Sequence, residues 1–337
     1  MIEEIYISGF SSYSNLGLID HNSSLDLEVL DKCNNKKFTT LPPYAEQAHV
    51  KKKSDANSMG PGQLLLAYAT GNLLETLGVL AESVDLKNKF DIYVSTRGGE
   101  RNESVDSSIF KANLEDNLDI NVELQKLRPV HFLTELPNLF AANLSILYDF
   151  LGESITFMGE DVASVNSVNS SIEKISSGRS DYVLNASVFN GDTGIHREFS
   201  ELNSHQNMYR DVCFGSASTS ILFSKKNAAI TDPIASLTKC GDIKIDNIAQ
   251  LIDSHGIDTV SISHSTRMTS DLLVYLNNNV ENVFNINEYI GNVFESALQI
   301  QIILSYLFCK NRSAKILILC ETFRDRFSGY ILNIQQK

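Results

Sequence analysis

The residues best able to do chemistry lie in one short segment near the middle of the chain. Glu160 and Asp161 stand between a β-branched run at 154–157 and a helix that should end at Gly178. Apolar residues spaced three or four apart indicate this helix; they are Val162, Val165, Val168, Ile172 and Ile175. Enzymes use a sharp strand-to-helix turn to present a nucleophile at a helix N-terminus, which stabilises an anion. This turn carries two carboxylates and no cysteine or serine in the nucleophile's place.

The elements that must position this turn alternate along the chain. Strands are predicted at 5–7, 91–96, 181–186, 216–223, 234–238, 259–263, 315–320 and 330–334. Helices are predicted at 63–80, 133–150, 247–254 and 293–308. The first strand should end in a turn at Ser8-Gly9, and 191–209 should be an irregular excursion with His196 and His205 on the surface. The alternation predicts two α/β halves, each with a mixed sheet between helices.

Composition excludes several classes of function. The formal net charge of -13 argues against a nucleic-acid or anionic-membrane partner. Five scattered cysteines without CxxC spacing predict reduced thiols in a cytoplasmic protein. The longest apolar stretch, 297–309, is interrupted by Gln299 and Gln301 and is too short to span a membrane. We expect no metal and no cofactor, because the histidines lack ligand partners and Gly98-Gly99 completes no phosphate-binding motif.

Several segments together carry a resemblance to a known family. They are 5–9 with 14–17, Arg128-Pro129 with 138–145, 157–163, and 214–223. With these segments the chain resembles the β-ketoacyl synthases of the thiolase superfamily over essentially its whole length. The resemblance implies an α/β, five-layered αβαβα fold of two related halves, with an N-terminal half at 1–225 and a C-terminal half at 226–337.

The resemblance also assigns the catalytic positions, most of which are degenerate. Asp161 falls on the family's cysteine, and His264 matches its first histidine. Asn287 stands for the lysine and Asn292 for the second histidine of the Lys-x-x-x-Gly-His motif. The final glycine-rich loop corresponds loosely to 321–328, where the glycines are replaced by Thr322, Arg324, Asp325 and Arg326.

These losses remove the chemistry of condensation. In the family, a thiolate at the helix N-terminus holds the acyl chain as a thioester, and two histidines stabilise the enolate formed by decarboxylation. A carboxylate at position 161 would give a mixed anhydride that hydrolyses readily. We therefore expect no acyl-enzyme by this route.

A synthase scaffold without the cysteine resembles the chain-length factors of type II polyketide systems, whose Glu-Gln pair is similar to Glu160-Asp161. Cysteine-less homologues also accompany synthases for aryl polyenes and long acyl chains. The resemblance implies a heterodimer with a cysteine-bearing β-ketoacyl synthase, with acyl carrier protein docking mainly through that partner. It places Phe157, Met158, Glu160 and Asp161 at the elbow and tunnel. It places Leu133, Leu136, Asn138, Phe140 and Asn143 at the interface.

Other interpretations stay open from the residues alone. Glu160 and Asp161 could simply favour the helix N-terminus, and His264 could be a scaffold histidine. A residual enzyme would use an elbow acid with His264 to decarboxylate malonyl carrier protein without condensation. A purely structural partner would only stabilise the active synthase. Cys213 is disfavoured as a displaced nucleophile because no helix N-terminus adjoins it.

Overall fold

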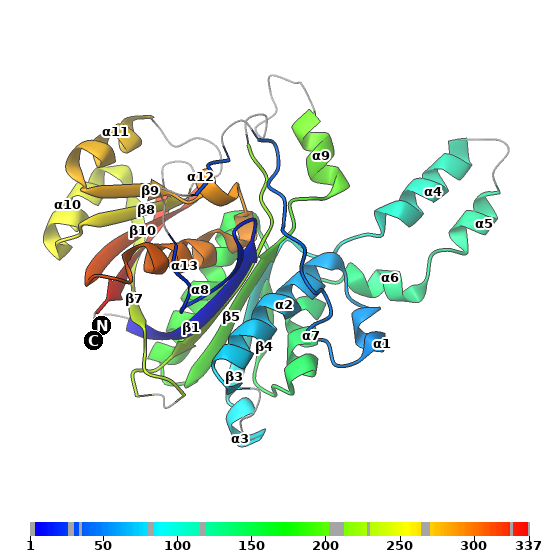
Figure 1. Cartoon of the computed structure of the whole chain (residues 1–337), viewed down its shortest axis with the longest axis horizontal. Coiled ribbons are helices and arrows are strands. Elements are labelled where there is room, and N and C mark those ends of the chain that lie inside the picture. Colours follow the sequence, from blue (N-terminus) through cyan, green and yellow to red (C-terminus); the bar gives the residue numbers. More distant parts are fainter. Residues whose placement is uncertain are drawn as a thin grey trace.

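Two runs of five strands, joined edge to edge, form the centre of the molecule (Figure 1). The computed structural model describes residues 4–25, 30–33, 36–79, 84–114, 119–201, 212–227, 230–263, 270–323 and 326–335. The first run comprises β1 (Glu4–Ser14), β3 (Phe90–Thr96), β4 (Ser154–Phe157), β5 (Tyr182–Phe189) and β6 (Ala217–Ser224). The second comprises β7 (Ala235–Lys244), β8 (Thr259–Ser263), β9 (Asn282–Asn285), β10 (Ala314–Phe323) and β11 (Arg326–Ile334). A short β2 (Gly17–Asp20) forms a hairpin with β1.

The two runs have the same topology. The spatial order is β4-β3-β5-β6-β1 followed by β7-β11-β10-β8-β9. In the first run β3 is parallel to β4 and β5, and β6 is antiparallel to β5 and β1. In the second run β8 is parallel to β9 and β10, and β11 is antiparallel to β10 and β7. The runs meet where β1 pairs antiparallel with β7, so the fold consists of two related halves.

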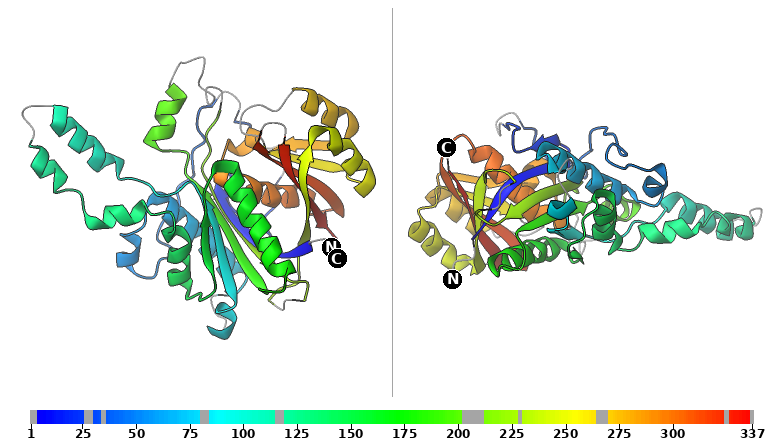
Figure 2. Two further views of the ribbon diagram at one scale, coloured as in Figure 1. Left: turned by 180° about the vertical axis from the view of Figure 1, so that it is seen from behind. Right: turned by 90° about the horizontal axis from the view of Figure 1, so that it is seen from below.

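Helices form three layers around these strands (Figures 1 and 2). Helices α8 (Glu160–Ser176) and α13 (Ala297–Cys309) pack between the two runs and contact both. Helices α2 (Pro61–Thr76) and α7 (Leu139–Tyr148) cover the other face of the first run. Helices α10 (Ile245–His255) and α11 (Ser270–Asn279) lie against the second run. This arrangement confirms the predicted thiolase-like layering.

The remaining described helices are short or project from the body. They are α1 (Lys53–Ala56), α3 (Val84–Lys87), α4 (Glu103–Leu114), α5 (Ile120–Leu124), α6 (Pro129–Thr134), α9 (Gly194–Glu201), α12 (Asn287–Ile290) and the 3-10 helix η2 (Phe294–Ser296). Helices α4, α5 and α6 extend away from the sheets as an arm, defined here as residues 101–136 (Figures 1 and 2). Within the described part of these three helices, only Ala112 is buried.

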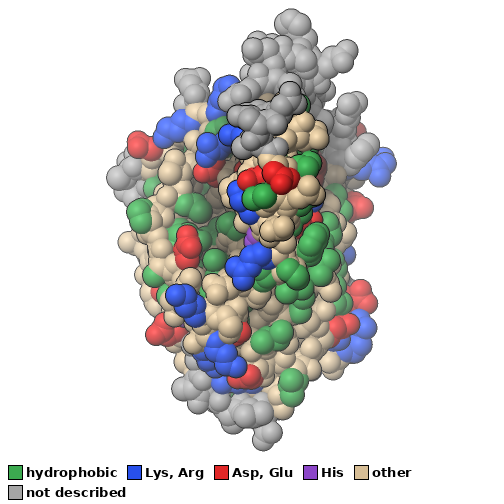
Figure 3. Space-filling view, turned by 90° about the vertical axis from the view of Figure 1, so that its right-hand side faces the viewer, with side chains coloured by type: hydrophobic (Ala, Val, Ile, Leu, Met, Phe, Trp, Pro, Cys, Tyr) green, Lys and Arg blue, Asp and Glu red, His purple; other side chains and the backbone are tan. Residues whose placement is uncertain are grey.

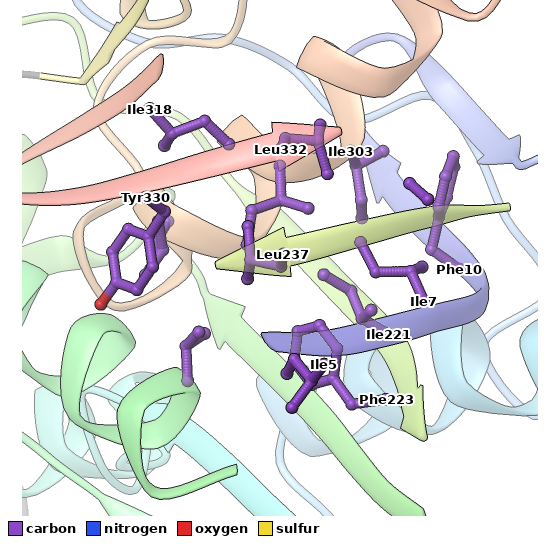
Figure 4. Close-up of a cluster of buried hydrophobic side chains, with 14 of the residues drawn as sticks. Ile5, Ile7, Phe10, Ile221, Phe223, Leu237, Ile303, Ile318, Tyr330 and Leu332 are labelled. Carbon is purple, nitrogen blue, oxygen red and sulfur yellow. The ribbon is translucent and has the colours of Figure 1, made fainter. Parts of the chain in front are cut away.

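The main apolar core lies in the middle layer (Figure 4). It joins side chains of both runs with those of α8 and α13, and its labelled members are Ile5, Ile7, Phe10, Ile221, Phe223, Leu237, Ile303, Ile318, Tyr330 and Leu332. Helix α13 is buried almost all round, which accounts for its predominantly apolar sequence. No helix in the described part of the chain has the length and hydropathy of a membrane span.

Three sequence-based expectations about local structure were wrong. Strand β1 continues through Ser8 and Gly9 to Ser14, because Gly9 serves a close approach and not a turn: a Cβ there would lie 2.8 Å from Leu77 Cδ2. The predicted helix at 133–150 is two helices, α6 and α7, separated at Pro137. The excursion at 191–209 contains α9, and the described His196 is buried at 2% exposure, while His205 lies outside the described residues.

Candidate functional site

The elbow, residues 158–161, joins the end of β4 to the start of α8 through unusual backbone angles. Gly159 precedes the helix with φ 126°, and Glu160, its first residue, has φ 51°. The left-handed region suits glycine and strains a glutamate, so packing around Glu160 must hold it there. Because Gly159 occupies the N-cap position, neither acid caps the helix from that position, although both lie in the first turn, where the dipole favours them.

A buried glutamate that the sequence did not single out lies against the elbow. Glu295 in η2 is 2% exposed, and its Oε1 accepts the backbone N–H of Glu160 at 3.1 Å. The Ser95 hydroxyl donates to the Glu295 carbonyl at 2.7 Å and fixes the backbone there. Burial raises the pKa of Glu295 to about 7. A carboxyl with such a pKa can hold a proton near neutral pH.

Asp161 belongs to the same group of carboxylates. Its side chain is half-buried, and loss of solvation raises its pKa well above the usual range, with the charges of Glu295, Glu160 and Glu321 adding to the effect. Like charges gathered in a poorly solvated site disfavour ionisation of each member. The elbow is therefore a site that retains protons and opposes a further negative charge.

A cation and a neutral imidazole complete this region. Arg97, which directly follows β3, lowers the pKa of Glu295 by its charge and donates from Nη1 to His196 Nε2. Because Nε2 accepts, the ring proton of His196 is on Nδ1, which donates to Thr193 Oγ1 at 2.9 Å. Burial and the charge of Arg97 lower the pKa of His196 to about 4, so the imidazole is neutral. His196 stacks near Phe214 and orients Arg97.

A thiol does lie near the elbow, but it is not poised to react. Cys320 in β10 is fully buried, and burial raises its pKa well above the usual range, with the charge of Asp161 adding to the effect. A protonated, buried thiol is a poor nucleophile. Cys213, considered as a displaced nucleophile, lies in the loop before β6, where its carbonyl accepts the N–H of Asn292 at 2.7 Å.

The two asparagines at the predicted lysine and histidine positions contact each other. Asn287 Nδ2 donates to Asn292 Oδ1 at 2.7 Å, and Ser263 Oγ donates to Asn287 Oδ1 at 3.4 Å. Amides donate and accept hydrogen bonds but do not titrate, so this pair cannot supply a proton as an imidazolium would. His264, the predicted surviving histidine, lies outside the described residues, as do Arg324 and Asp325.

A polar network holds the helices beneath the elbow. Gln299 Nε2 in α13 lies 2.9–3.0 Å from Ser95 Oγ, Ser167 Oγ and Asn185 Oδ1, and its two hydrogens are shared among these three acceptors. All four side chains are fully buried. The network therefore links α13, β3, α8 and β5. A shift of one of these elements against the others would displace the elbow.

The other predicted elbow and tunnel residues lie at its rim. Phe157 packs edge-to-face on Tyr93 with ring centres 5.7 Å apart, and Met158 is 52% exposed. A hollow of about 360 Å³ follows the outer face of α8; it is lined by Phe157, Asn166, Asn169, Ser170, Glu173 and Lys239. The elbow carboxylates do not line this hollow. In the described residues no group of three or more potential ligands is placed to hold a metal ion.

The predicted interface residues divide into two groups. Leu133 and Leu136 on the arm are exposed, as is Asn138. Phe140 is buried in the chain's own core, and Asn143 Nδ2 donates to Gln63 Oε1 at 3.3 Å. The direct contacts of an interface could thus come from the first group, while the second supports α7. The interface role of all five residues stays a prediction.

Comparisons with known proteins agree with this fold. The β-ketoacyl synthase N-terminal domain family matches residues 26–212, more than half of the chain. A search of curated proteins found no match. The chain is similar to the AntDE:AntF structure, a type II PKS acyl-carrier protein in complex with its ketosynthase bound to the hexaketide (16% identity, 99% of this chain, 100% of that chain, TM-score 0.77).

Two further solved structures show the same architecture. The ishigamide ketosynthase/chain length factor is 13% identical over 98% of this chain and 99% of that chain, with a TM-score of 0.67. A β-ketoacyl synthase from Burkholderia phymatum STM815 is 11% identical over 99% of this chain and 100% of that chain, with a TM-score of 0.71. Likeness at such identities shows the fold, and the domain match shows the family. On this ground the chain belongs to the β-ketoacyl synthase family.

Proposed function

We propose that the chain is a non-condensing, chain-length-factor-like subunit that pairs with a cysteine-bearing β-ketoacyl synthase and shapes its acyl tunnel. The observation that carries this proposal is the elbow, where Asp161, the residue that we assign to the nucleophile's position, lies beside Glu160 and the buried Glu295. Covalent catalysis by this family's route needs a thiolate, and the nearby Cys320 is buried and protonated. The partner would supply the reactive cysteine.

The electrostatics of the elbow also disfavour the residual enzyme. A malonyl thioester carries its own carboxylate, which would approach Glu160, Asp161 and Glu295. Repulsion from these carboxyl groups and the poor solvation of Asp161 and Glu295 oppose a further anion. Within the described part of the chain, Arg97 is the cation that acts on Glu295. A decarboxylase built on the elbow acids therefore finds no support in this arrangement.

The arm and the adjoining sheet edge support the pairing. Half of the large apolar side chains found exposed in the described residues lie on the arm: Phe110, Leu114, Val122, Leu124, Phe132, Leu133 and Leu136. Figure 3 shows the molecule from the side on which the arm extends, and on this face apolar side chains gather beside a recess. Strand β4 is the last strand in the order at that side, so its outer edge is available to a strand of another subunit. A partner would cover both features.

Charge supports docking of the carrier protein on the partner. The chain has a formal net charge of -13, and an acidic carrier protein would be repelled by it. The active synthase would then present the basic docking surface. Structural relatives include a carrier protein bound to its ketosynthase and a ketosynthase/chain length factor pair, which are the assemblies proposed for this chain.

Co-expression with a cysteine-bearing synthase, followed by size-exclusion chromatography and product mass, tests the pairing. Phe132→Glu on the exposed side of α6 should abolish co-migration, whereas Val274→Glu, an equally exposed apolar site on α11, should not. Met158→Trp at the elbow rim should change product length while the pair stays assembled. Unchanged products would favour the purely structural partner. Acyl elongation by the chain alone, or its labelling by a cerulenin-type inhibitor, would refute the proposal.

A further inference from the structure

Glu295 is a buried carboxyl group to which the proposed function assigns no task of its own. Its carboxylate accepts a hydrogen bond from the backbone N–H of Glu160, a residue 135 positions away in the sequence. The preceding Phe294 has φ 32°, a strained value for a non-glycine residue, so the chain is held in an unfavourable conformation to place this side chain. Its second oxygen, Oε2, is buried and has no hydrogen-bond partner among the described residues. A placement that is strained and only half satisfied suggests a role beyond packing.

The Glu295 carboxylate occupies a donor that an anion at the start of α8 would use. The first N–H groups of a helix have no partner within the helix and can bind anions. In this chain the Glu160 N–H, one residue before position 161, already donates to Glu295 Oε1. A ligand oxygen that binds at this N–H must displace the internal carboxylate.

The charges around Glu295 and its neighbour Asp161 come from three parts of the chain. Helix α8 contributes Glu160 and Asp161, β10 contributes Glu321, and the residue after β3 is Arg97. A thiolate or an acyl oxyanion at this point would face several carboxylates and one guanidinium. The carboxylates outnumber the guanidinium, so the net electrostatic effect disfavours an anion here. A thiol placed at this point would therefore resist ionisation.

We propose that Glu295 is an internal plug of the elbow, which occupies the elbow N–H and prevents this subunit from forming or binding an acyl intermediate. The inference deepens the proposed function and rests on it only in taking Asp161 as the slot of the missing thiol. It implies that condensation is blocked twice, by the lost nucleophile and by Glu295. Restoring a cysteine alone would not produce a reactive thiol.

Thiol alkylation in the purified chain tests this directly. Asp161→Cys is compared with Asp161→Cys/Glu295→Gln, which removes the charge but keeps an acceptor, and with Asp161→Cys/Glu295→Ala, which also removes the acceptor. Iodoacetamide labelling at position 161 is followed by peptide mass mapping at several pH values. The matched control is Asp161→Cys/Glu173→Gln, which removes an exposed carboxylate from the far end of the same helix.

We expect Glu295→Gln to speed alkylation at position 161 by about tenfold or more at neutral pH, the change in thiolate fraction for one pKa unit. The Glu173→Gln control should leave the rate unchanged. Fast alkylation with Glu295 intact, or equal effects of the two substitutions, would overturn the plug. Because the assay uses no partner, failed pairing would sink the proposed function and leave this result standing.

A second measurement needs no substitution. In the wild-type chain the Glu160 amide should be protected from hydrogen exchange, because it donates to a buried acceptor. Exchange at the rate of an exposed amide would show that Glu295 does not occupy the elbow and would overturn the proposal even if the variants fail to fold.

Discussion

Replacing Glu295 with glutamine should make the protein more stable, and by an amount that grows with pH. Glutamine has nearly the same shape and keeps an oxygen for the Glu160 N–H, so the substitution removes mainly the charge. The wild-type carboxyl is 2% exposed and must ionise inside the folded chain as the pH rises. The stability difference between the two proteins therefore reports the free energy of burying this charge.

The magnitude follows from the two pKa values. Burial raises the pKa of Glu295 from 4.5 to about 7. Below pH 4.5 the carboxyl is protonated in both states and carries no penalty. Between pH 4.5 and pH 7 the unfolded state ionises while the folded state keeps its proton, so stability falls, and above about pH 7 the loss levels off at about 3 kcal/mol, which corresponds to the difference between the two pKa values. About 2 kcal/mol of this loss falls between pH 5.5 and pH 8.

Urea unfolding followed by far-ultraviolet circular dichroism measures the free energy of unfolding of wild type and Glu295→Gln at each pH. The advantage of Glu295→Gln over wild type should grow by about 2 kcal/mol from pH 5.5 to pH 8. The charge of Glu295 also raises the pKa of Asp161. Removing this charge lowers that pKa and stabilises the folded chain in the same direction. Glu173→Gln, an exposed carboxylate on α8, should show no such trend. Parallel stability curves for wild type and Glu295→Gln would refute the buried-charge reasoning.

Three other predictions concern groups around the elbow and arm. His196 should stay neutral, because its pKa is about 4, and its ring-proton NMR shifts should be flat from pH 5.5 to 8; a midpoint near 6.5 would contradict its burial. Gln299→Met should lower the free energy of unfolding in urea by about 2–4 kcal/mol, since three buried partners lose a donor; a loss below about 0.5 kcal/mol would contradict the network. Glu100→Ala should speed limited proteolysis of the arm several-fold, because the Glu100 carboxylate accepts the Gly62 N–H at 2.6 Å at the arm's base; unchanged cleavage would show that this contact does not hold the arm.

The sequence predicted local structure well where one periodicity dominated. The stripe from Val162 to Ile175 defined α8, and its elbow begins where predicted. The strand at 259–263 is β8 within the same limits. Such elements are determined by the regular spacing of apolar side chains along the chain, and this spacing depends only on residues that are near in sequence.

The sequence-based predictions failed where the surroundings of a side chain come from segments that are distant in the sequence. His196 has the polar neighbours of a surface residue, yet Phe189 and Phe214 enclose it. Glu295 resembles an ordinary first-turn acid three residues after Asn292, and no sequence signal marks its contact with Glu160. Apart from Leu133 and Leu136, which were predicted as interface residues within a helix at 133–150, the arm was not predicted, because its apolar residues face outward and follow no buried face. The division of the halves at residue 225 stays a prediction.

The identity of the elbow was present in the amino-acid order: a strand, two acids without a thiol, and an amphipathic helix. That order carries the prediction that Asp161 stands at the family's nucleophile position, since the prediction depends only on which side chains follow the strand. Tertiary structure alone decided that Glu295 and Glu321 join Glu160 and Asp161, with Arg97 beside them. The physical reason is that protonation and ligand access depend on desolvation and on distances between charges, and these exist only once remote segments have packed together.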